Sequence, residues 1–340
     1  MATSLDGLPP ALPGRREVID TAAGRVGFYA SAEAEGVPLL LIHSINAAAN
    51  AYEVRPLYLH AQNPHAQDPH AQDPHAQDPH ALDPHAQDPH AQDPHAQDPH
   101  AQGARPVYAL DLPGFGFSER SRRLYDPRLM VDAIHAVAAE IAGRHGGVRI
   151  DAIALSLSAT YLARAVIERP DVYRAIGLIS PTGFDRRLAG RGPAGGDRGS
   201  PRVRRIVDSP ILGPALFALL VSRPSMRFFL RKTFGSKRID EGLFAYDHLS
   251  AHQPGARHAP YCFVAGHLFP TDATTLYEAL TLPVLMLHGS RGDFVDFRDA
   301  PRFAGRPNWT IRALPTGAFP HFEDPATVTG AFDAFFAGLA

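Results

Sequence analysis

Several residue types are scarce in this sequence, and each scarcity argues against a class of protein. Cys262 is the only cysteine among 340 residues, which excludes an intrachain disulfide. Its neighbours Tyr261, Phe263 and Val264 are apolar or aromatic, a setting typical of a buried, unreactive thiol rather than a catalytic one. No apolar run approaches the roughly 20 residues that a bilayer-spanning helix requires. No motif typical of nucleic acid binding is present, so nucleic acid is not an expected partner.

The amino terminus also lacks a basic segment followed by an apolar one, which is the pattern of an export signal. We therefore expect a cytoplasmic protein with no transmembrane segment. Hydrophobic residues make up 45% of the chain, which is enough apolar material for a sizeable core.

Residues 60–102 form a repeat of the unit HAQDP, with Asn63 and Leu82 as the only departures. A proline every fifth residue blocks any long helix, and there is almost nothing larger than alanine to bury. We therefore predict a disordered insertion that acts as a spacer. The regular histidines and aspartates leave a second interpretation open, a weak metal-binding or pH-sensitive segment, although a flexible array offers no preformed coordination shell.

Outside the repeat, apolar runs typical of buried strands alternate with helical patterns. The predicted strands cover residues 38–44, 106–112, 150–155, 173–180, 283–290 and 309–314. This alternation predicts a parallel sheet with helices on both faces. A hairpin over residues 16–30 is expected at one edge of the sheet, and a final helix begins at Asp324 and Pro325.

Residues 185–281 break the alternation and are predicted to form a helical cap. Between Arg186 and Arg238 there are 13 basic and 2 acidic residues. The plainer interpretation is a solvated arginine-rich surface. The other is attraction to an anionic substrate or to a membrane surface, with the apolar segment ALFALLV making peripheral contact.

One of these strands, Ile150 to Leu155, runs directly into a helix that ends before Pro170, with Ser156 at the junction. This is the layout of a nucleophile elbow, G-x-S-x-G, in which small residues let strand and helix approach closely. Here the two glycine positions hold Ala154 and Ser158.

The ordered segments LLLIHS (39–44), ALDLPGFGFS (109–118), ALSLS (154–158), LHGSRGDFVD (287–296) and GAFPHFEDP (317–325) resemble the α/β-hydrolase fold family. The resemblance covers nearly the whole chain outside the repeat. It implies an α/β protein with an eight-stranded, mostly parallel sheet, whose core comprises residues 1–184 and 282–340. It also implies that the cap, residues 185–281, follows the sixth strand.

The resemblance further implies Ser156 as nucleophile and Asp293 as the acid, with Asp296 the second choice. The oxyanion would be held by the backbone N–H groups of Leu157 and Ile45. No metal or organic cofactor is implied. Family members that act on haloalkanes or epoxides use an aspartate nucleophile, so a serine at this position excludes those reactions.

The histidine is the point at which the sequence departs most from the family. A gapless match places Ala318 where the catalytic histidine belongs, and His321 lies three residues further on. We predict a displaced triad in which His321 is the base and Asp293 orients it. The alternative is that His321 is a structural histidine beside Glu323. His43 is expected to be structural.

The predicted function is that of a serine hydrolase, which cleaves a carboxylic ester or a related acyl bond of an apolar or anionic small molecule. The alternative is a catalytically silent protein of the same fold that binds a ligand or a partner in the pocket under the cap.

Overall fold

The structure, a computed structural model, describes residues 7–31, 34–64, 104–184, 190–294 and 296–339. Its centre is an eight-stranded sheet with the strand order β1-β2-β4-β3-β5-β6-β7-β8. The strands are β1 (Arg15–Thr21), β2 (Gly24–Ala30), β3 (Leu39–Ile42), β4 (Val107–Asp111), β5 (Ile150–Leu155), β6 (Tyr173–Ile179), β7 (Val284–Gly289) and β8 (Trp309–Leu314). The predicted hairpin, β1 and β2, is antiparallel, and the strands from β4 to β8 along the sheet are parallel.

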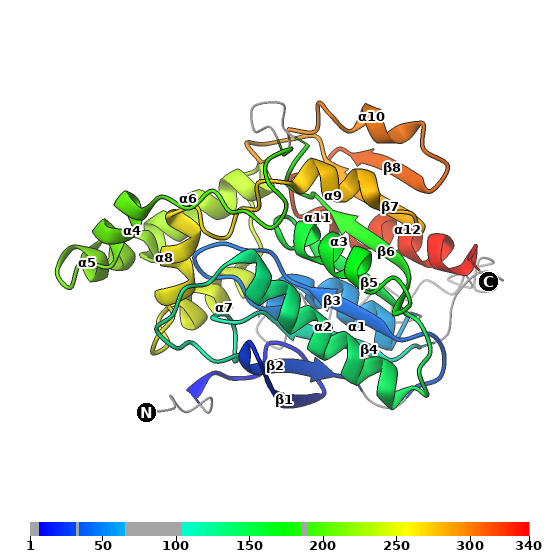
Figure 1. Ribbon diagram of the computed structural model, residues 1–340, viewed down its shortest axis with the longest axis horizontal. Coiled ribbons are helices and arrows are strands. Elements are labelled where there is room, and N and C mark those ends of the chain that lie inside the picture. The colour runs from blue at the N-terminus through cyan, green and yellow to red at the C-terminus, as the bar shows by residue number, and fades with distance from the viewer. Residues whose placement is uncertain (1–6, 32–33, 65–103, 185–189, 295, 340) are drawn as a thin grey trace, which may run out of the picture.

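Helices cover both faces of this sheet, as the alternating pattern predicted (Figure 1). One face carries α2 (Pro127–Arg144), α3 (Ser158–Glu168) and α10 (Pro301–Ala304); the other carries α1 (Arg55–Gln62), α11 (Pro320–Glu323) and α12 (Pro325–Ala337). Each face has its own cluster of buried apolar side chains. Strands such as β3 and β5 are buried along their whole length, which explains why they are continuous apolar runs rather than alternating ones.

Between β6 and β7 the chain forms a series of helices in the region predicted as a cap. They are α4 (Pro201–Val207), α5 (Leu212–Leu220), α6 (Arg223–Phe234), α7 (Glu241–Ala251), α8 (His258–Val264) and α9 (Ala273–Ala279). We call residues 190–279 the inserted helical segment. In Figure 1 its helices α4, α5, α6 and α8 extend to the left of the sheet, while α9 lies beside α3. None of the described helices is both long and apolar enough to cross a membrane.

The start of the HAQDP repeat corrects one expectation. His60, Ala61 and Gln62 form the last turn of α1 instead of belonging to a disordered insertion. Ala61 is buried, and the His60 ring lies 2.6 Å from the carboxylate of Asp333 on α12. The helix continues because the first proline of the repeat is Pro64, which leaves the preceding residues free to complete the turn. The remaining copies, from residue 65, lie outside the described residues.

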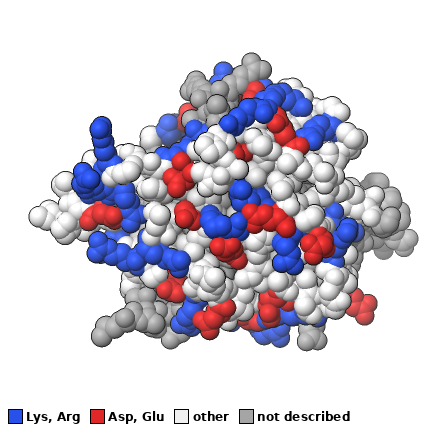
Figure 2. Space-filling view, in the orientation of Figure 1, with Lys and Arg blue, Asp and Glu red and all other residues white. Residues whose placement is uncertain are grey.

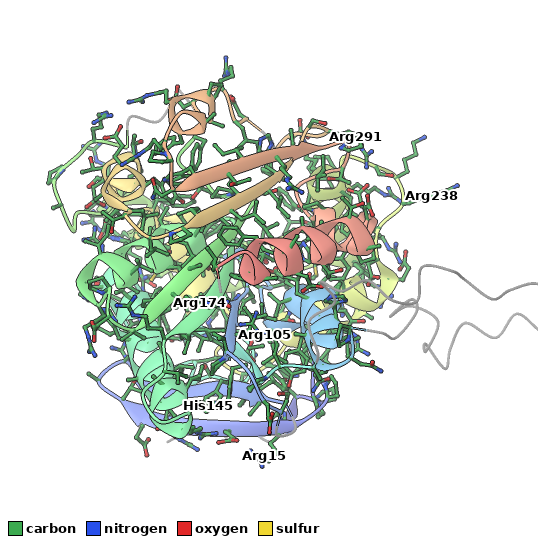
Figure 3. All side chains as sticks on the ribbon, turned by 90° about the vertical axis from the view of Figure 1, so that its right-hand side faces the viewer. Arg15, Arg105, His145, Arg174, Arg238 and Arg291 are labelled. Atoms are coloured by element: carbon green, nitrogen blue, oxygen red, sulfur yellow. The ribbon has the colours of Figure 1, made fainter. Side chains whose placement is uncertain are left out.

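A buried ionic cluster lies at the amino ends of the central strands, opposite the ends that carry Ser156. Asp151 of β5 is fully buried and is held by two arginines from neighbouring segments. Arg105 donates to it at 2.5 Å, and Arg174 of β6 donates at 2.9 and 2.7 Å. Figure 3 labels both arginines near the amino ends of the central strands. The pairing compensates the cost of removing the carboxylate from water.

Replacing Asp151 with alanine is therefore expected to lower the free energy of unfolding by about 3–5 kcal/mol, because the buried charge of Arg105 would lose its carboxylate partner. Urea denaturation of the two proteins measures the difference. Asp171→Ala is the matched control, since its ion pair with Arg169 is at the surface and should contribute no more than about 1 kcal/mol. Equal losses for the two variants would contradict this account of Asp151.

Candidate active site

Ser156 lies at the junction of β5 and α3 in a strained backbone conformation. Its φ is 53°, and only one other described residue besides glycine, Ser180, has a positive φ. This left-handed conformation is costly for a residue with a side chain and persists only where the surroundings enforce it. The surroundings here are the end of β6: the Ser156 N–H donates to Ile179 at 2.9 Å, and the Ser156 carbonyl accepts from Thr182 at 3.2 Å.

The two positions that lack the elbow glycines fit the turn without them. Ala154 is buried in β5, paired with Ile42 on one side and Leu178 on the other. Ser158 is fully buried, and its hydroxyl donates to the His43 carbonyl at 2.6 Å. The serine at this position thus ties the start of α3 to the loop after β3, a bond that glycine could not form.

The loop after β3 carries Ile45, the residue predicted to supply an oxyanion donor. This loop is bonded to Glu53, which lies in the 3-10 helix η2 (Ala51–Val54). Its carboxylate accepts from the Ser44 N–H and from the Asn46 side chain, each at 2.7 Å, and Asn46 in turn accepts from the Ala48 N–H at 2.7 Å. Ile45 is therefore fixed from both sides.

The backbone N–H groups of Ile45 and Leu157 have no hydrogen-bond acceptor within the described part of the chain. Leu157 directly precedes the first residue of α3, and the first N–H groups of a helix have no partner within it. Both N–H groups are thus available to a developing negative charge, as an oxyanion site requires.

His321 lies in α11 and is completely buried. Its ring does not make the hydrogen bond to Ser156 that the predicted triad requires. Its Nε2–H donates to the Glu53 carbonyl at 2.7 Å, while Nδ1 has no hydrogen-bond partner among the described residues. Burial lowers the pKa of His321 to about 4, so the ring is neutral at physiological pH and Nδ1 carries a free lone pair. No hydrogen bond joins it to Ser156.

The predicted acids lie at the surface. Asp293 has a 59% exposed side chain and forms an ion pair with Lys232 of α6 at 2.9 Å. Asp296 forms hydrogen bonds with Arg298 at 2.8 and 2.5 Å. Ala318 is buried, and its N–H donates to the Thr233 carbonyl at 2.7 Å. The structure thus brings Ser156, Ile45 and Leu157 to the carboxyl ends of the central strands but joins neither His321 nor Asp293 to Ser156.

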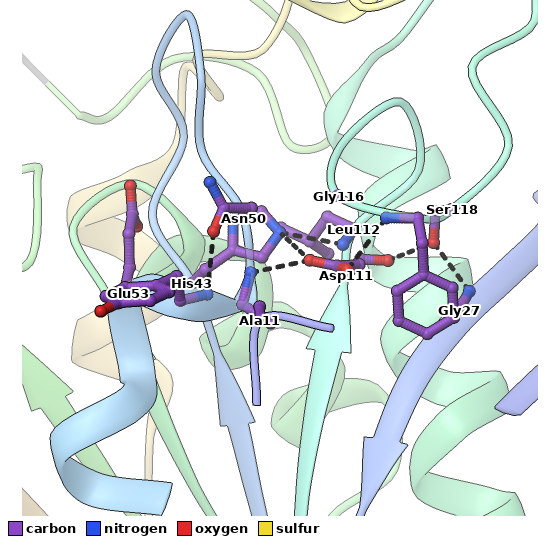
Figure 4. A network of polar contacts seen from close by, with 12 residues as sticks. Ala11, Gly27, His43, Asn50, Glu53, Asp111, Leu112, Gly116 and Ser118 are labelled. Carbon is purple, nitrogen blue, oxygen red and sulfur yellow. Dashed lines mark hydrogen bonds and ion pairs between the residues drawn. The ribbon is translucent and has the colours of Figure 1, made fainter. Parts of the chain in front are cut away.

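A second polar network supports this edge from the DLPGFGFS segment (Figure 4). The carboxylate of Asp111 accepts from the N–H groups of Ala51, at 2.7 Å, and Phe117, at 3.0 Å. Gly116 has φ 49°, and a Cβ there would lie within 2.0 Å of this carboxylate, so the close approach requires glycine. His43 is structural, as expected: one ring nitrogen accepts from the Leu112 N–H and the other donates to the Ser44 carbonyl.

Burial raises the pKa of Glu53 to about 7, and the hydrogen bonds from Ser44 and Asn46 oppose that rise. A carboxyl group whose folded pKa exceeds its unfolded value of 4.5 stabilises the fold fully below pH 4.5 and loses that contribution as the pH rises to about 7. Compared with Glu53→Gln, the wild-type protein should therefore lose about 3 kcal/mol of stability across this window, since each pKa unit corresponds to about 1.4 kcal/mol. Denaturant unfolding at a series of pH values measures the difference.

Glu17→Gln provides a control of opposite sign. The hydrogen bond from Arg144 lowers the pKa of Glu17, so its contribution is present above pH 4.5 and is lost as the pH falls. If both variants showed the same trend with pH, the raised pKa of Glu53 would be refuted.

Sequence reasoning missed three residues that organise this edge: Glu53, Asn46 and Asp247. Asp247 of α7 is buried and accepts from the Asn50 side chain at 2.9 Å, which connects the inserted helical segment to the loop after β3. Burial raises the pKa of Asp247 well above its ordinary value. In the sequence these residues lie in segments with no recognisable motif, so no signal distinguishes them from surface polar residues.

Two large hollows in the described surface lie away from Ser156. One of about 580 Å³ is lined by α4 and by residues around Pro210, and one of about 590 Å³ lies between β1 and α2. Among the described residues, no group of three or more histidine, cysteine, aspartate or glutamate side chains could hold a metal ion.

Comparisons with solved structures agree with this architecture. A serine hydrolase involved in carbazole degradation superposes with a TM-score of 0.64 at 12% identity, covering 96% of this chain and 99% of its own. The meta-cleavage product hydrolase from Pseudomonas fluorescens IP01 gives 0.62 at 14% identity, covering 95% and 98%. A thermophilic esterase from Thermogutta terrifontis gives 0.59 at 16% identity, covering 96% and 99%. No protein-family model and no curated protein matches the sequence.

The sheet order, the two helical layers and these superpositions define the class of the protein. The chain has the α/β-hydrolase fold, with an eight-stranded, mostly parallel sheet, as the sequence predicted. At these identities the likeness establishes the fold and leaves the chemistry to be argued from the site.

Proposed function

We propose that this protein is a serine hydrolase that cleaves a carboxylic ester or a related acyl bond of a small molecule. The observation that carries the proposal is the position of Ser156, which is held at φ 53°. The unbonded N–H of Leu157 follows it in the chain, and the unbonded N–H of Ile45 lies in the loop that Ser158 ties to the start of α3. Backbone strain at a non-glycine residue is concentrated at functional sites. The solved structures of similar fold include serine hydrolases and an esterase by their own descriptions.

In the proposed reaction, the Ser156 hydroxyl attacks the carbonyl carbon of the substrate, and the N–H groups of Ile45 and Leu157 bind the oxygen as it becomes negative. The alcohol then leaves, and water attacks the acyl-serine to release the acid. A serine hydroxyl needs a base to accept its proton at neutral pH. We assign that role to His321, whose Nδ1 holds a free lone pair.

This assignment requires a shift of α11, the short helix before α12, because His321 makes no hydrogen bond with Ser156 in the structure. In the arrangement observed, the Glu53 carbonyl fixes the ring proton on Nε2, and this leaves Nδ1 as the proton acceptor. Asp293 is proposed to orient the ring once α11 has shifted, and for this its carboxylate must leave Lys232.

A fluorophosphonate probe tests the nucleophile, and short p-nitrophenyl esters test turnover. The proposal expects covalent labelling of the wild-type protein and release of p-nitrophenol. A folded protein, checked by circular dichroism, that is neither labelled nor active on a panel of acyl chain lengths would overturn it.

A second candidate function is the binding of a ligand without turnover. It is favoured by the burial of His321 and by the ion pair that holds Asp293 at the surface. If this candidate holds, Ala318→His would place an imidazole at the position that the family uses and would raise ester turnover about 10²-fold or more. If His321 is the base, Ala318→His should change turnover little. Initial rates on the same ester distinguish the two outcomes, and thermal unfolding checks that the buried Ala318 site tolerates the ring.

A further inference from the structure

The helix α5 presents apolar side chains to solvent around most of its circumference. It contains no charged residue, and only two residues separate its nine residues LGPALFALL from α6. Three large apolar side chains of the helix are exposed, Leu219 to 68%, Leu212 to 55% and Leu216 to 45%, and so is Ile211 directly before it, to 80%. We call these four residues the apolar tip. Contiguous exposed apolar surface of this kind marks a site of interaction rather than ordinary surface.

Arginines surround the apolar tip. The helices α4 to α6, residues 201–234, contain seven basic residues and one acidic residue. Three of the basic residues have acidic partners: Arg204 pairs with Asp208, Arg227 with Glu241 and Lys232 with Asp293. The other four form no ion pair with a described residue and are exposed: Arg202, Arg205, Arg223 and Arg231. Figure 2 shows the tip as an uncharged point at the left of the molecule, with Lys and Arg above and below it.

The charge decides which partner fits this surface. A second copy of the chain would bring two sets of unpaired arginines together around the same apolar contact, and like charges in such an interface are strongly unfavourable. An anionic bilayer complements both parts of this surface, because its negative headgroups attract the arginines and its apolar interior accepts the tip. A nine-residue helix is about 14 Å long, too short to span a bilayer but suited to lie in its interface.

We propose that the apolar tip and its arginines dock this protein on the surface of an anionic lipid bilayer. Ile211, Leu212, Leu216 and Leu219 enter the boundary between headgroups and acyl chains, and Arg202, Arg205 and Arg223 contact lipid phosphates. This inference does not depend on turnover at Ser156. If the protein is a hydrolase, docking at this end presents the inserted helical segment, which follows the strand beside Ser156, to substrates dissolved in the membrane.

Co-sedimentation of the full chain with vesicles tests the proposal. Vesicles of phosphatidylcholine alone are compared with vesicles of phosphatidylcholine and phosphatidylglycerol in equal parts, at low and at physiological salt. We expect binding to the anionic vesicles that weakens as salt rises. Equal binding to both vesicle types, or none to either, would overturn the proposal.

Two pairs of substitutions locate the surface. Leu212→Asp with Leu219→Asp removes the apolar contact, and Arg202→Glu with Arg205→Glu reverses the charge; each pair should weaken partitioning at least about fivefold. Val148→Asp and Arg149→Glu are matched controls, because Val148 is 45% exposed and both lie at the far end of α2 from the inserted segment. All these side chains are exposed, so the variants should fold, which circular dichroism checks. Controls that weaken binding as much as the tip variants would refute the location.

The fluorescence of an added tryptophan supplies an independent reading. The sequence has one tryptophan, the buried Trp309 of β8, so the signal of Leu216→Trp can be obtained by difference. Its emission should shift to shorter wavelength when anionic vesicles are added. If the tip instead joins two protein chains, size-exclusion chromatography without lipid will show a dimer that Leu212→Asp disrupts, and that result would also overturn the proposal.

Discussion

Ser156→Ala is expected to abolish labelling by a fluorophosphonate and to reduce ester turnover by a factor of about 10³ or more. Removing the nucleophile of a serine hydrolase leaves only the contribution of the oxyanion donors and of substrate binding. The N–H groups of Ile45 and Leu157 do not depend on the hydroxyl, so binding of a non-reactive carboxylate ligand should survive. Gel fluorescence of the labelled protein and initial rates with p-nitrophenyl acetate measure the two effects.

Ser180→Ala is a closely matched control for this variant. Ser180 directly follows β6, has φ 44°, and its hydroxyl is buried without a hydrogen-bond partner among the described residues. Both substitutions thus remove a serine hydroxyl from a strained backbone position at the same edge of the sheet. Ser180→Ala should retain labelling and turnover. Labelling that persists in Ser156→Ala, or that disappears in Ser180→Ala, would show that the probe reacts elsewhere.

The sequence was sufficient for the fold because burial on both faces of a parallel sheet leaves a strong pattern. The strands β5 and β6 match their predicted ranges to within one residue, whereas β3, predicted over residues 38–44, covers only Leu39–Ile42. The last helix begins at Pro325 with Asp324 as its N-cap, as predicted. The predicted start of the disordered insertion, residue 60, was wrong, because a compositional repeat hides the few residues that complete a helical turn.

The site was less accessible from the sequence, because its geometry depends on the directions in which side chains point. The small residues around Ser156 were sufficient to locate the strained turn between β5 and α3. Neither the bond from Ser158 to the His43 carbonyl nor the hold of Glu53 on the loop after β3 leaves a local pattern. Whether the ring of His321 faces Ser156 or Glu53 is decided by contacts between segments far apart in the chain, and such contacts carry no signal in one sequence.

His321→Gln is the sharpest test of the proposed base. Glutamine can keep a donor for the Glu53 carbonyl, which His321 now bonds at 2.7 Å, but it cannot accept a proton from a serine. If His321 is the base, turnover should fall by a factor of about 10²–10⁴, the usual contribution of general base catalysis. The free energy of unfolding should change less than in His321→Ala, which loses the hydrogen bond and should cost about 1–3 kcal/mol. Ester kinetics and urea denaturation of both variants give the two readings.

The pair of variants separates catalysis from structure. A structural histidine predicts that glutamine preserves activity and that alanine lowers it only as far as it destabilises the fold. If His321 is the base, both variants lose turnover to the same extent, and only His321→Ala also loses stability. His135→Gln, which alters a histidine paired with Glu168 on the far side of α2, should change neither quantity. Preserved turnover in His321→Gln would reject His321 as the base and would show that another group accepts the proton of Ser156.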